Sequence, residues 1–342
     1  MPDGSRFDVS GLEAPVVQAP MAGGVSTPAL AAAVSAAGGL GFLAAGYLTA
    51  DQVREQIVQT RMLTDAPFGV NVFVPGQSIA DPEQVTEYAL SLTAEAERLG
   101  VSVGEPHPDH DDWHAKIALL EETSPAVASF TFGVPSPAVV ARLQEAGVAV
   151  GVTVTSLAEL VEAKASKPDF VVAQGPLAGG HRGTFDPLAL PSEQPLYALL
   201  AELSSNTRLP IVVAGGLASS EDVEGVLAAG AAAAQAGTAF LRSDEAGTAP
   251  AYRAALVSAE YPRTALTKAF TGRWARGLVN DFMRDHESDA PFGYPEVHQV
   301  TSPLRRAAAS AGDAQRMALW AGVHHDRALA APAATILSTL VP

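Results

Sequence analysis

The chain has 342 residues, of which 48% are hydrophobic and 17% charged, a composition too apolar for a disordered protein. Lys and Arg number 21 against 37 Asp and Glu, and the net charge of −16 repels nucleic-acid phosphates and anionic membrane surfaces, so neither is expected as a partner. The absence of cysteine excludes disulfides, thiolate nucleophiles and iron–sulfur clusters. A compact globule of the size of an enzyme is the class that remains.

The first 50 residues raise the question of targeting. The start lacks the cationic and apolar regions of a secretory signal, which predicts a cytoplasmic protein. No charge occurs between Glu13 and Asp51, a length that could cross a bilayer. Pro20, Pro28 and several glycines interrupt this stretch, so we expect a buried strand, helix and strand instead.

Short apolar runs alternate with helical stretches along most of the chain. The runs predict strands near residues 16–19, 40–44, 68–74, 127–132, 148–154, 170–173, 210–214 and 232–236. Helix starts are marked by Ser26 or Thr27, by Ser136, and by the capping boxes Thr49…Gln52 and Ser156…Glu159. Nearly continuous apolar strands suit a buried parallel sheet, and eight such units in about 250 residues predict a (β/α)8 barrel. A doubly wound sheet would not explain why polar and glycine residues gather at so many strand ends.

The βα rhythm sets the expected domain boundaries. Residues 1–258 are predicted to form the barrel, with an elaborated crossover near 75–124. Residues 259–342 lack the rhythm and are predicted to be a mainly helical addition that covers one end of the barrel. The long connection over 175–209 opens with a glycine-rich segment, and long loops in compact domains are usually functional.

Glycines after the seventh and eighth predicted strands indicate an anion site. Gly215 and Gly216 follow one strand, and Gly237 and Thr238 follow the next. Barrels commonly bind phosphate at this position, because glycines let backbone N–H groups approach the oxygens and a short helix after Thr238 would add its positive end. We therefore predict a phosphate site there, although a simple tight turn would also use two glycines.

Two further strand ends carry features that suit a ligand. Pro20 and Met21 end the first strand and offer a flat apolar wall beside free backbone groups, which suits an aromatic ring. Asn71 and Gln174 lie within or at the end of apolar strands, where a buried amide must have partners. The sequence leaves open whether those partners are backbone groups or a ligand.

His181 is the candidate catalytic residue. It lies in the segment Ala-Gly-Gly-His-Arg-Gly at 178–183, where flanking glycines indicate tight packing around a ligand. An imidazole has an unperturbed pKa of about 6.5 and can act as a general base near neutrality. The other seven histidines, including those of the acidic loop and near the C-terminus, are interpreted as surface or structural residues. None forms a metal-ligand spacing, so no metal is predicted.

Four segments together resemble the nitronate monooxygenase family, formerly called 2-nitropropane dioxygenases. They are Gln-Ala-Pro-Met-Ala-Gly at 18–23, Gly-Phe-Leu-Ala-Ala-Gly-Tyr at 41–47, Gly-Val-Asn-Val-Phe-Val-Pro at 69–75 and the histidine segment at 178–183, and they are similar to the segments typical of its class I. The resemblance implies an FMN-dependent (β/α)8 barrel with His181 as the catalytic residue. It implies FMN contacts from Pro20, Met21, Ala22, Asn71, Gln174, Gly179, Gly180, Gly215, Gly216, Gln235, Ala236, Gly237 and Thr238.

Later stretches also look familial, with two departures. Thr-Lys-Ala-Phe-Thr-Gly-Arg at 267–273 and Tyr-Pro-Glu-Val-His at 294–298 resemble family segments. Pro176 and Leu177 stand where relatives often carry an acidic residue, and Ser302 stands where the class I pattern has Lys. Both departures bear on substrate identity and not on flavin binding.

The resemblance implies oxidation of alkyl nitronates by FMN and O2 to a carbonyl compound and nitrite. His181 would extend this to neutral nitroalkanes as a base, or would hold the nitronate anion if it were protonated. One alternative is an FMN-dependent enoyl-thioester reductase that uses NAD(P)H, since such reductases resemble the same barrel. A second is a phosphate-ligand-binding barrel without redox chemistry. The sequence leaves open whether the chain forms a homo-oligomer.

Overall fold

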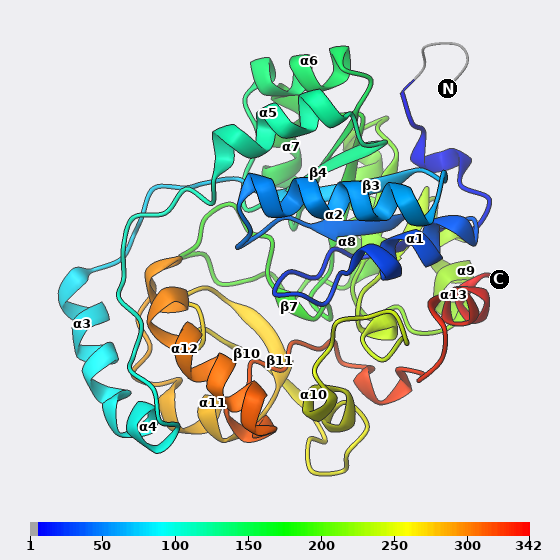
Figure 1. Ribbon diagram of the computed structural model, residues 1–342. Coiled ribbons are helices and arrows are strands. Elements are labelled where there is room, and N and C mark those ends of the chain that lie inside the picture. Colours follow the sequence, from blue (N-terminus) through cyan, green and yellow to red (C-terminus); the bar gives the residue numbers. More distant parts are fainter. Residues whose placement is uncertain (1–5) are drawn as a thin grey trace.

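A computed structural model describes residues 6–342, and its centre is a closed barrel of parallel strands (Figure 1). The eight-stranded sheet has the order β1-β9-β8-β6-β5-β4-β3-β2, and a parallel bridge between Val17 and Leu40 joins its two ends. The barrel strands are β1 (Val16–Gln18), β2 (Gly41–Ala44), β3 (Phe68–Phe73), β4 (Val127–Thr131), β5 (Ala149–Val154), β6 (Phe170–Gln174), β8 (Ile211–Ala214) and β9 (Ala233–Ala236). The predicted (β/α)8 fold is confirmed, and each predicted strand end agrees to within one residue.

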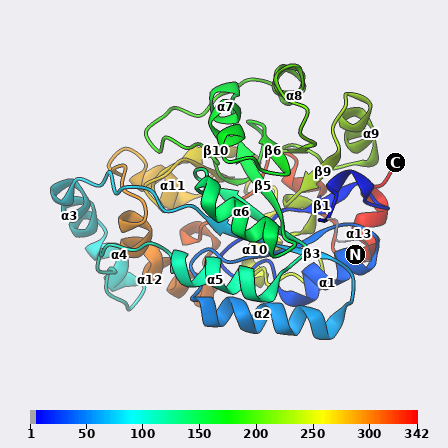
Figure 2. The same ribbon diagram turned by 90° about the horizontal axis from the view of Figure 1, so that it is seen from above.

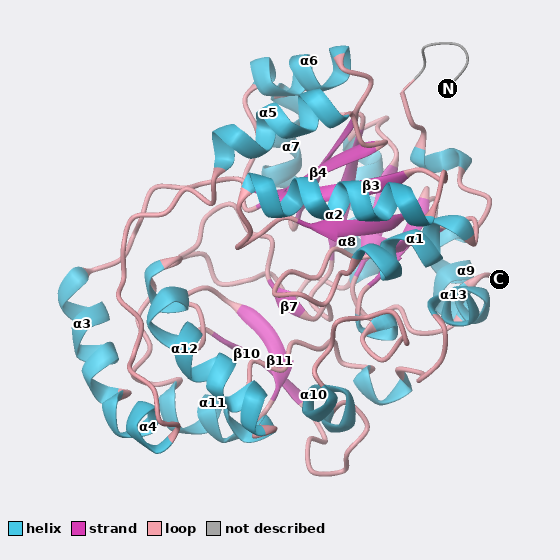
Figure 3. Ribbon diagram, in the orientation of Figure 1, coloured by secondary structure: helices cyan, strands magenta, loops and turns pink. Residues whose placement is uncertain are grey.

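Helices cover the outside of the barrel (Figure 3). They are α1 (Pro28–Ala36), α2 (Ala50–Leu63), α5 (Trp113–Thr123), α6 (Pro137–Glu145), α7 (Leu157–Ala165), α8 (Leu196–Asn206), α9 (Ser220–Ala228) and α13 (Ala333–Leu340). The short α10 (Pro250–Ala255) packs instead against C-terminal residues such as Leu278 and Met317. Thr27 and Ser136 cap their helices as predicted, and Thr49 with Gln52 forms a complete capping box. These caps satisfy first-turn N–H groups that have no partner within the helix.

The second predicted capping box is only half formed. Ser156 accepts a hydrogen bond from the backbone N–H of Glu159, as expected. The Glu159 carboxylate does not return to Ser156; it accepts from the N–H of Thr155 at 2.5 Å and from the N–H of Phe185 at 2.9 Å. The prediction was wrong in this detail because the N–H of Thr155, directly after β5, and the N–H of Phe185, in the loop after His181, compete for the same carboxylate.

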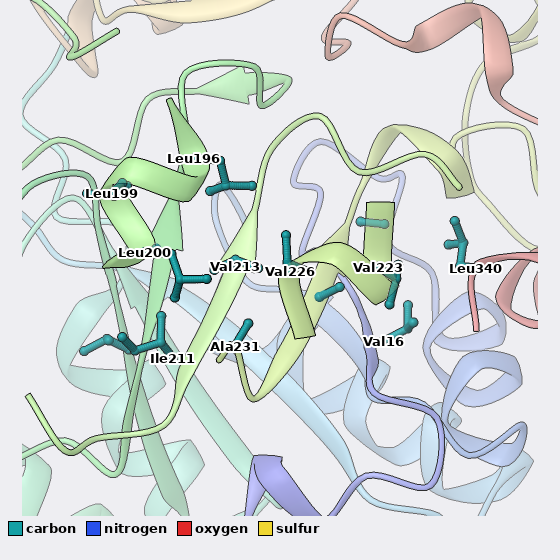
Figure 4. Packing of buried hydrophobic residues seen from close by; sticks show 14 of the residues in the cluster. Val16, Leu196, Leu199, Leu200, Ile211, Val213, Val223, Val226, Ala231 and Leu340 are labelled. Carbon is teal, nitrogen blue, oxygen red and sulfur yellow. The ribbon is translucent and has the colours of Figure 1, made fainter. Parts of the chain in front are cut away.

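Two aromatic rings in the barrel interior occupy space that neighbouring glycines leave free. A Cβ on Gly69 would lie 2.3 Å from the Phe42 ring, and a Cβ on Gly151 would lie 2.3 Å from the Phe170 ring. Outside the strands, a larger apolar cluster joins β8 to the helices α8, α9 and α13, as Figure 4 shows for Ile211, Val213 and their neighbours. Apolar side chains thus pack both inside and outside the barrel strands, and the polar site residues lie at the carboxyl ends of the strands.

A second group of helices lies to one side of the barrel (Figures 1 and 2). It consists of α3 (Pro82–Ser91) and α4 (Thr93–Arg98) from the crossover, and α11 (Asp281–His286) and α12 (Glu296–Ala311) from the C-terminal region. Tyr88 of α3 shares one buried cluster with Phe270, Phe282 and Val300. The crossover and the C-terminal region therefore build this side lobe together.

A small antiparallel sheet connects the side lobe with the histidine segment. Its strands β10 (Thr264–Thr267) and β11 (Ala275–Leu278) were not predicted, and β11 pairs with the two-residue strand β7 (Gly180–His181). The chain then returns to the barrel, where α13 packs against α1 and α9. In the part of the chain that the structure describes, no helix combines the length and apolar character needed to span a membrane.

Candidate active site

A cavity of about 660 Å³ opens at the carboxyl ends of the barrel strands. Every residue predicted for the site lines it: Pro20, Met21, Ala22, Asn71, Gln174, Gly179, Gly180, His181, Gly215, Gly216, Gln235, Ala236, Gly237 and Thr238. The structure thus brings together residues from β1, β3, β6, β8 and β9, as the barrel topology requires.

One end of the cavity is lined by glycines and backbone N–H groups. Gly215 and Gly216 have φ angles of +115° and +81°, values that L side chains rarely adopt. Among residues 6–342, the N–H groups of Gly216 and Gly237 have no hydrogen-bond acceptor. The expected helix after Thr238 is a single 3-10 turn, Thr238–Phe240, and the Thr238 hydroxyl accepts from the N–H of Gly322. This end offers unpaired donors and room for an anion.

The wall formed by Pro20 and Met21 is fixed from behind by a buried serine. Ser26 Oγ accepts from the N–H of Met21 at 2.9 Å and from Gln18 Nε2 at 3.0 Å. Gln18 Oε1 accepts from the N–H of Phe42 at 2.9 Å, so this amide is tied to the next strand. The hydrogen bonds that hold this loop come from Ser26 and Gln18, while Met21 also packs against C-terminal residues such as Met317 and Leu319.

The two buried amides have different partners. Gln174 Nε2 donates to the His181 carbonyl at 3.0 Å, and its Oε1 accepts from the N–H of Gly183 at 2.8 Å, so Gln174 holds the histidine segment on both sides. Asn71 Nδ2 donates to Ser129 Oγ at 2.9 Å, and within the described chain its Oδ1 has no donor. Backbone groups thus satisfy Gln174, whereas Asn71 keeps one acceptor at the cavity.

The hydrogen bonds around His181 define its tautomer. Its Nε2 lies 2.9 Å from Thr271 Oγ1, and the Thr271 hydroxyl donates to the Arg273 carbonyl at 3.2 Å. Because a hydroxyl has one proton, Thr271 accepts from Nε2–H. A neutral His181 then carries its lone pair on Nδ1, which has no partner among the described residues.

Arginines beside His181 favour its neutral form. Burial first, and then the positive charges of Arg273 and Arg305, lower the pKa of His181 to about 3. The Arg273 guanidinium lies 4.0 Å from the centre of the Phe132 ring, and burial lowers its pKa to about 10, so it stays charged. Within residues 6–342, neither arginine forms a salt bridge. Cations without a carboxylate partner in a cavity suit an anionic ligand.

Most of the cavity wall around His181 was not predicted from the sequence. Aromatic rings surround His181 there: the centroids of Phe132, Tyr294 and Trp320 lie 5.8, 6.0 and 5.4 Å from the imidazole. His298 also lines the cavity, and its interpretation as a surface or structural residue was incomplete. The signal was the four-residue spacing of His298 and Ser302, which places both on one face of α12.

The two departures from the family pattern lie at different places. The Pro176 carbonyl accepts from Arg276 Nε at 3.1 Å, and Leu177 is 41% exposed beside the glycine end. Ser302 lines the cavity, and its Oγ accepts from Arg306 Nη1 at 3.1 Å. A cation is therefore present one helical turn beyond the position where the class I pattern has Lys.

A second cavity of about 640 Å³ adjoins the first across Phe73, Phe132 and His298. Its lining includes His107 and His110 from the acidic crossover loop, which were interpreted as surface residues. Aromatic rings thus lie between the strand-end cavity and this second, more polar cavity.

These features describe a (β/α)8 barrel with the strand-end cavity typical of barrel enzymes; among residues 6–342, backbone N–H groups at its glycine end and Nδ1 of His181 in its wall have no hydrogen-bond partner. The nitronate monooxygenase family model matches residues 7–342. A nitronate monooxygenase of Paraburkholderia phytofirmans is 39% identical, with 96% of this chain and 92% of that protein covered. The nitroalkane oxidase structure from Streptomyces ansochromogenes is 48% identical with a TM-score of 0.92, covering 97% and 96% of the chains. FabK from Thermotoga maritima is 26% identical with a TM-score of 0.73, covering 97% and 93%. The chain belongs to the nitronate monooxygenase family.

Proposed function

We propose that the protein binds FMN in the strand-end cavity and uses it with O2 to oxidise alkyl nitronates to carbonyl compounds and nitrite. The residues present fit FMN. The unpaired N–H groups of Gly216 and Gly237 would hold the phosphate, and Pro20 and Met21 would face the ring. Asn71 Oδ1, which lacks a donor, would accept from a ring N–H. When bound, FMN supplies the electron transfer from substrate to oxygen.

The surroundings of His181 assign two tasks to different residues. Arg273 and Arg305 carry charge without a carboxylate partner and would hold the nitronate anion. His181 is neutral and would act on neutral nitroalkanes as a base. The Cα–H bond breaks, its electron pair forms the C=N bond of the nitronate, and the proton moves to His181 Nδ1. Thr271 keeps the ring in the orientation that exposes this nitrogen.

The observation that carries the proposal is the free Nδ1 of His181 in a cavity whose other end is lined by unpaired backbone donors. Anaerobic mixing of the purified protein with propionate 3-nitronate tests it. We expect a flavin spectrum in the isolated protein that bleaches on mixing, and nitrite after oxygen is admitted. Flavin that is reduced by NADPH and reoxidised by an enoyl thioester, but unaffected by nitronate, would support the reductase alternative. Protein without flavin would support the phosphate-binding alternative.

A further inference from the structure

We propose that His298 is a second functional histidine, which donates a hydrogen bond from Nε2–H to the nitro or nitronate oxygens of the substrate. This inference deepens the proposed function and rests on it. The sequence indicated only a surface or structural role for His298, but the side chain lines both the strand-end cavity and the adjoining second cavity.

Shared aromatic neighbours place His298 near His181. The Tyr294 ring centroid lies 6.0 Å from that of His181 and 6.3 Å from that of His298. His298 also stacks on Tyr47, with centroids 4.0 Å apart and planes at 6°. Stacking fixes the plane of the imidazole, and therefore the direction of its N–H bond.

Arg305 fixes which nitrogen of His298 carries the proton. Arg305 Nη2 lies 3.0 Å from His298 Nδ1. A guanidinium has no acceptor, so Nδ1 must accept and a neutral ring must carry its proton on Nε2. Burial, followed by the charge of Arg305, lowers the pKa of His298 to about 2, so the ring remains neutral. Among the described residues, Nε2 has no hydrogen-bond partner and is left for a ligand.

The two histidines therefore offer complementary hydrogen-bonding groups to the same cavity, one an acceptor and the other a donor. His181 is anchored through Nε2–H and exposes an acceptor, whereas His298 is anchored through Nδ1 and exposes a donor. When the substrate loses its α-proton to His181, negative charge moves to the nitro oxygens. A donor polarised by Arg305 stabilises that charge more than it stabilises the neutral nitro group, which is the condition for lowering the barrier.

The substitution His298→Phe tests the donor with little change in packing. A phenyl ring retains the stack on Tyr47, and Arg305 retains its bonds to the carbonyl of residue 298 at 3.0 Å and to Thr301 Oγ1 at 3.1 Å. His298→Gln is the matched control, since its amide offers one acceptor and one donor in place of the two ring nitrogens.

The first measurement is binding of propionate, whose carboxylate has the shape and charge of a nitronate group, to the FMN-loaded protein. We expect His298→Phe to raise the Kd about ten- to a hundred-fold and His298→Gln to recover most of that loss. The second is kcat/KM for nitroethane, which should fall by a similar factor in His298→Phe with unchanged FMN content. Equal Kd and kcat/KM in all three proteins would overturn the proposal.

Histidine nitrogen NMR of the wild-type protein gives a third readout that does not depend on turnover. His181 and His298 should both be protonated on Nε2 and unprotonated on Nδ1, and we expect one set of signals of this kind to disappear in His298→Phe. A ring at 298 protonated on Nδ1, or on both nitrogens, would overturn the assignment. If the wild-type protein binds FMN and propionate as expected but does not oxidise nitronate, the proposed function fails while the role of His298 as an anion donor stands.

Discussion

The two ends of the strand-end cavity are built in different ways. The glycine end uses residues that directly follow barrel strands, such as Gly216 after β8 and Gly237 after β9. The histidine end combines β7, which Gln174 also ties to the barrel, with residues from 271 to 320 that belong to the small sheet and the side lobe. The first end is a property of the barrel, whereas the second depends on elements distant in the sequence.

This difference indicates that the residues that retain the cofactor and the residues that turn over the substrate are held in place by different parts of the structure. Contacts around Ser26 and Gly216 do not involve the side lobe, and the contacts of His181 with Thr271 and of His298 with Arg305 do. Substitutions at one end should therefore change flavin content, and those at the other end should change turnover. Each prediction below tests that separation.

The largest effect is expected for His181→Asn. Loss of the base should lower turnover of neutral nitroalkanes about 10²–10⁴-fold while FMN content stays unchanged. Activity on pre-formed nitronates should fall much less, because these have already lost the α-proton. Steady-state assays with both substrate forms measure the ratio. Near-wild-type rates on both forms would remove His181 from the mechanism.

Gly216→Val should act on the other end. The residue has φ +81°, where a side chain costs roughly 1–2 kcal/mol, and a Cβ would lie 3.1 Å from Leu177. We expect FMN affinity to fall about ten-fold or more, as measured by flavin titration. Gly230→Val is the matched control: Gly230 has φ +100° with open space around its Cβ, so stability should fall but flavin should remain. Full flavin content in Gly216→Val would contradict the phosphate placement.

Glu159→Gln should affect the histidine end from the barrel side. Its carboxylate accepts from the N–H groups of Thr155 and Phe185, and an amide can accept with only one oxygen. One buried donor is left unpaired, which costs about 1–3 kcal/mol. We expect the Tm to fall by several degrees and kcat to fall several-fold at unchanged flavin affinity. A matching loss of flavin affinity would show that the two ends are coupled.

The smallest effect concerns pH. The pKa of His181 is lowered to about 3 by burial, Arg273 and Arg305, so the ring keeps its free Nδ1 well below the ordinary histidine pKa. As pH falls from about 8 to about 5, kcat/KM for a neutral nitroalkane should stay level, and it should decline only as the pH approaches the lowered pKa. A half-maximal value near pH 6.5 would contradict a lowered pKa of His181 in the flavin-loaded protein.

The barrel and its glycine end could be predicted because their signals are local. Gly215 and Gly237 directly follow apolar runs, and the capping residues Thr27 and Thr49 each bind a backbone N–H only three residues later. The histidine end could be predicted only at His181. Its partner Thr271 is 90 residues away, and His298 depends on the contact of α12 with the crossover helix α3, which no periodicity reports. Glu159 shows the same limit, since its competing donor comes from Phe185.

The pairing of β11 with β7 has a consequence for how such proteins diversify. Ala275 and Arg276 meet His181 and Gly180 through strand pairing, whose hydrogen bonds are independent of side-chain identity. A recombined gene could therefore receive residues 264–320 from a relative and still re-form this junction, with the packing of α12 on α3 as the remaining constraint. Substrate range could change by exchange of one contiguous segment while the inherited cofactor cradle is left intact.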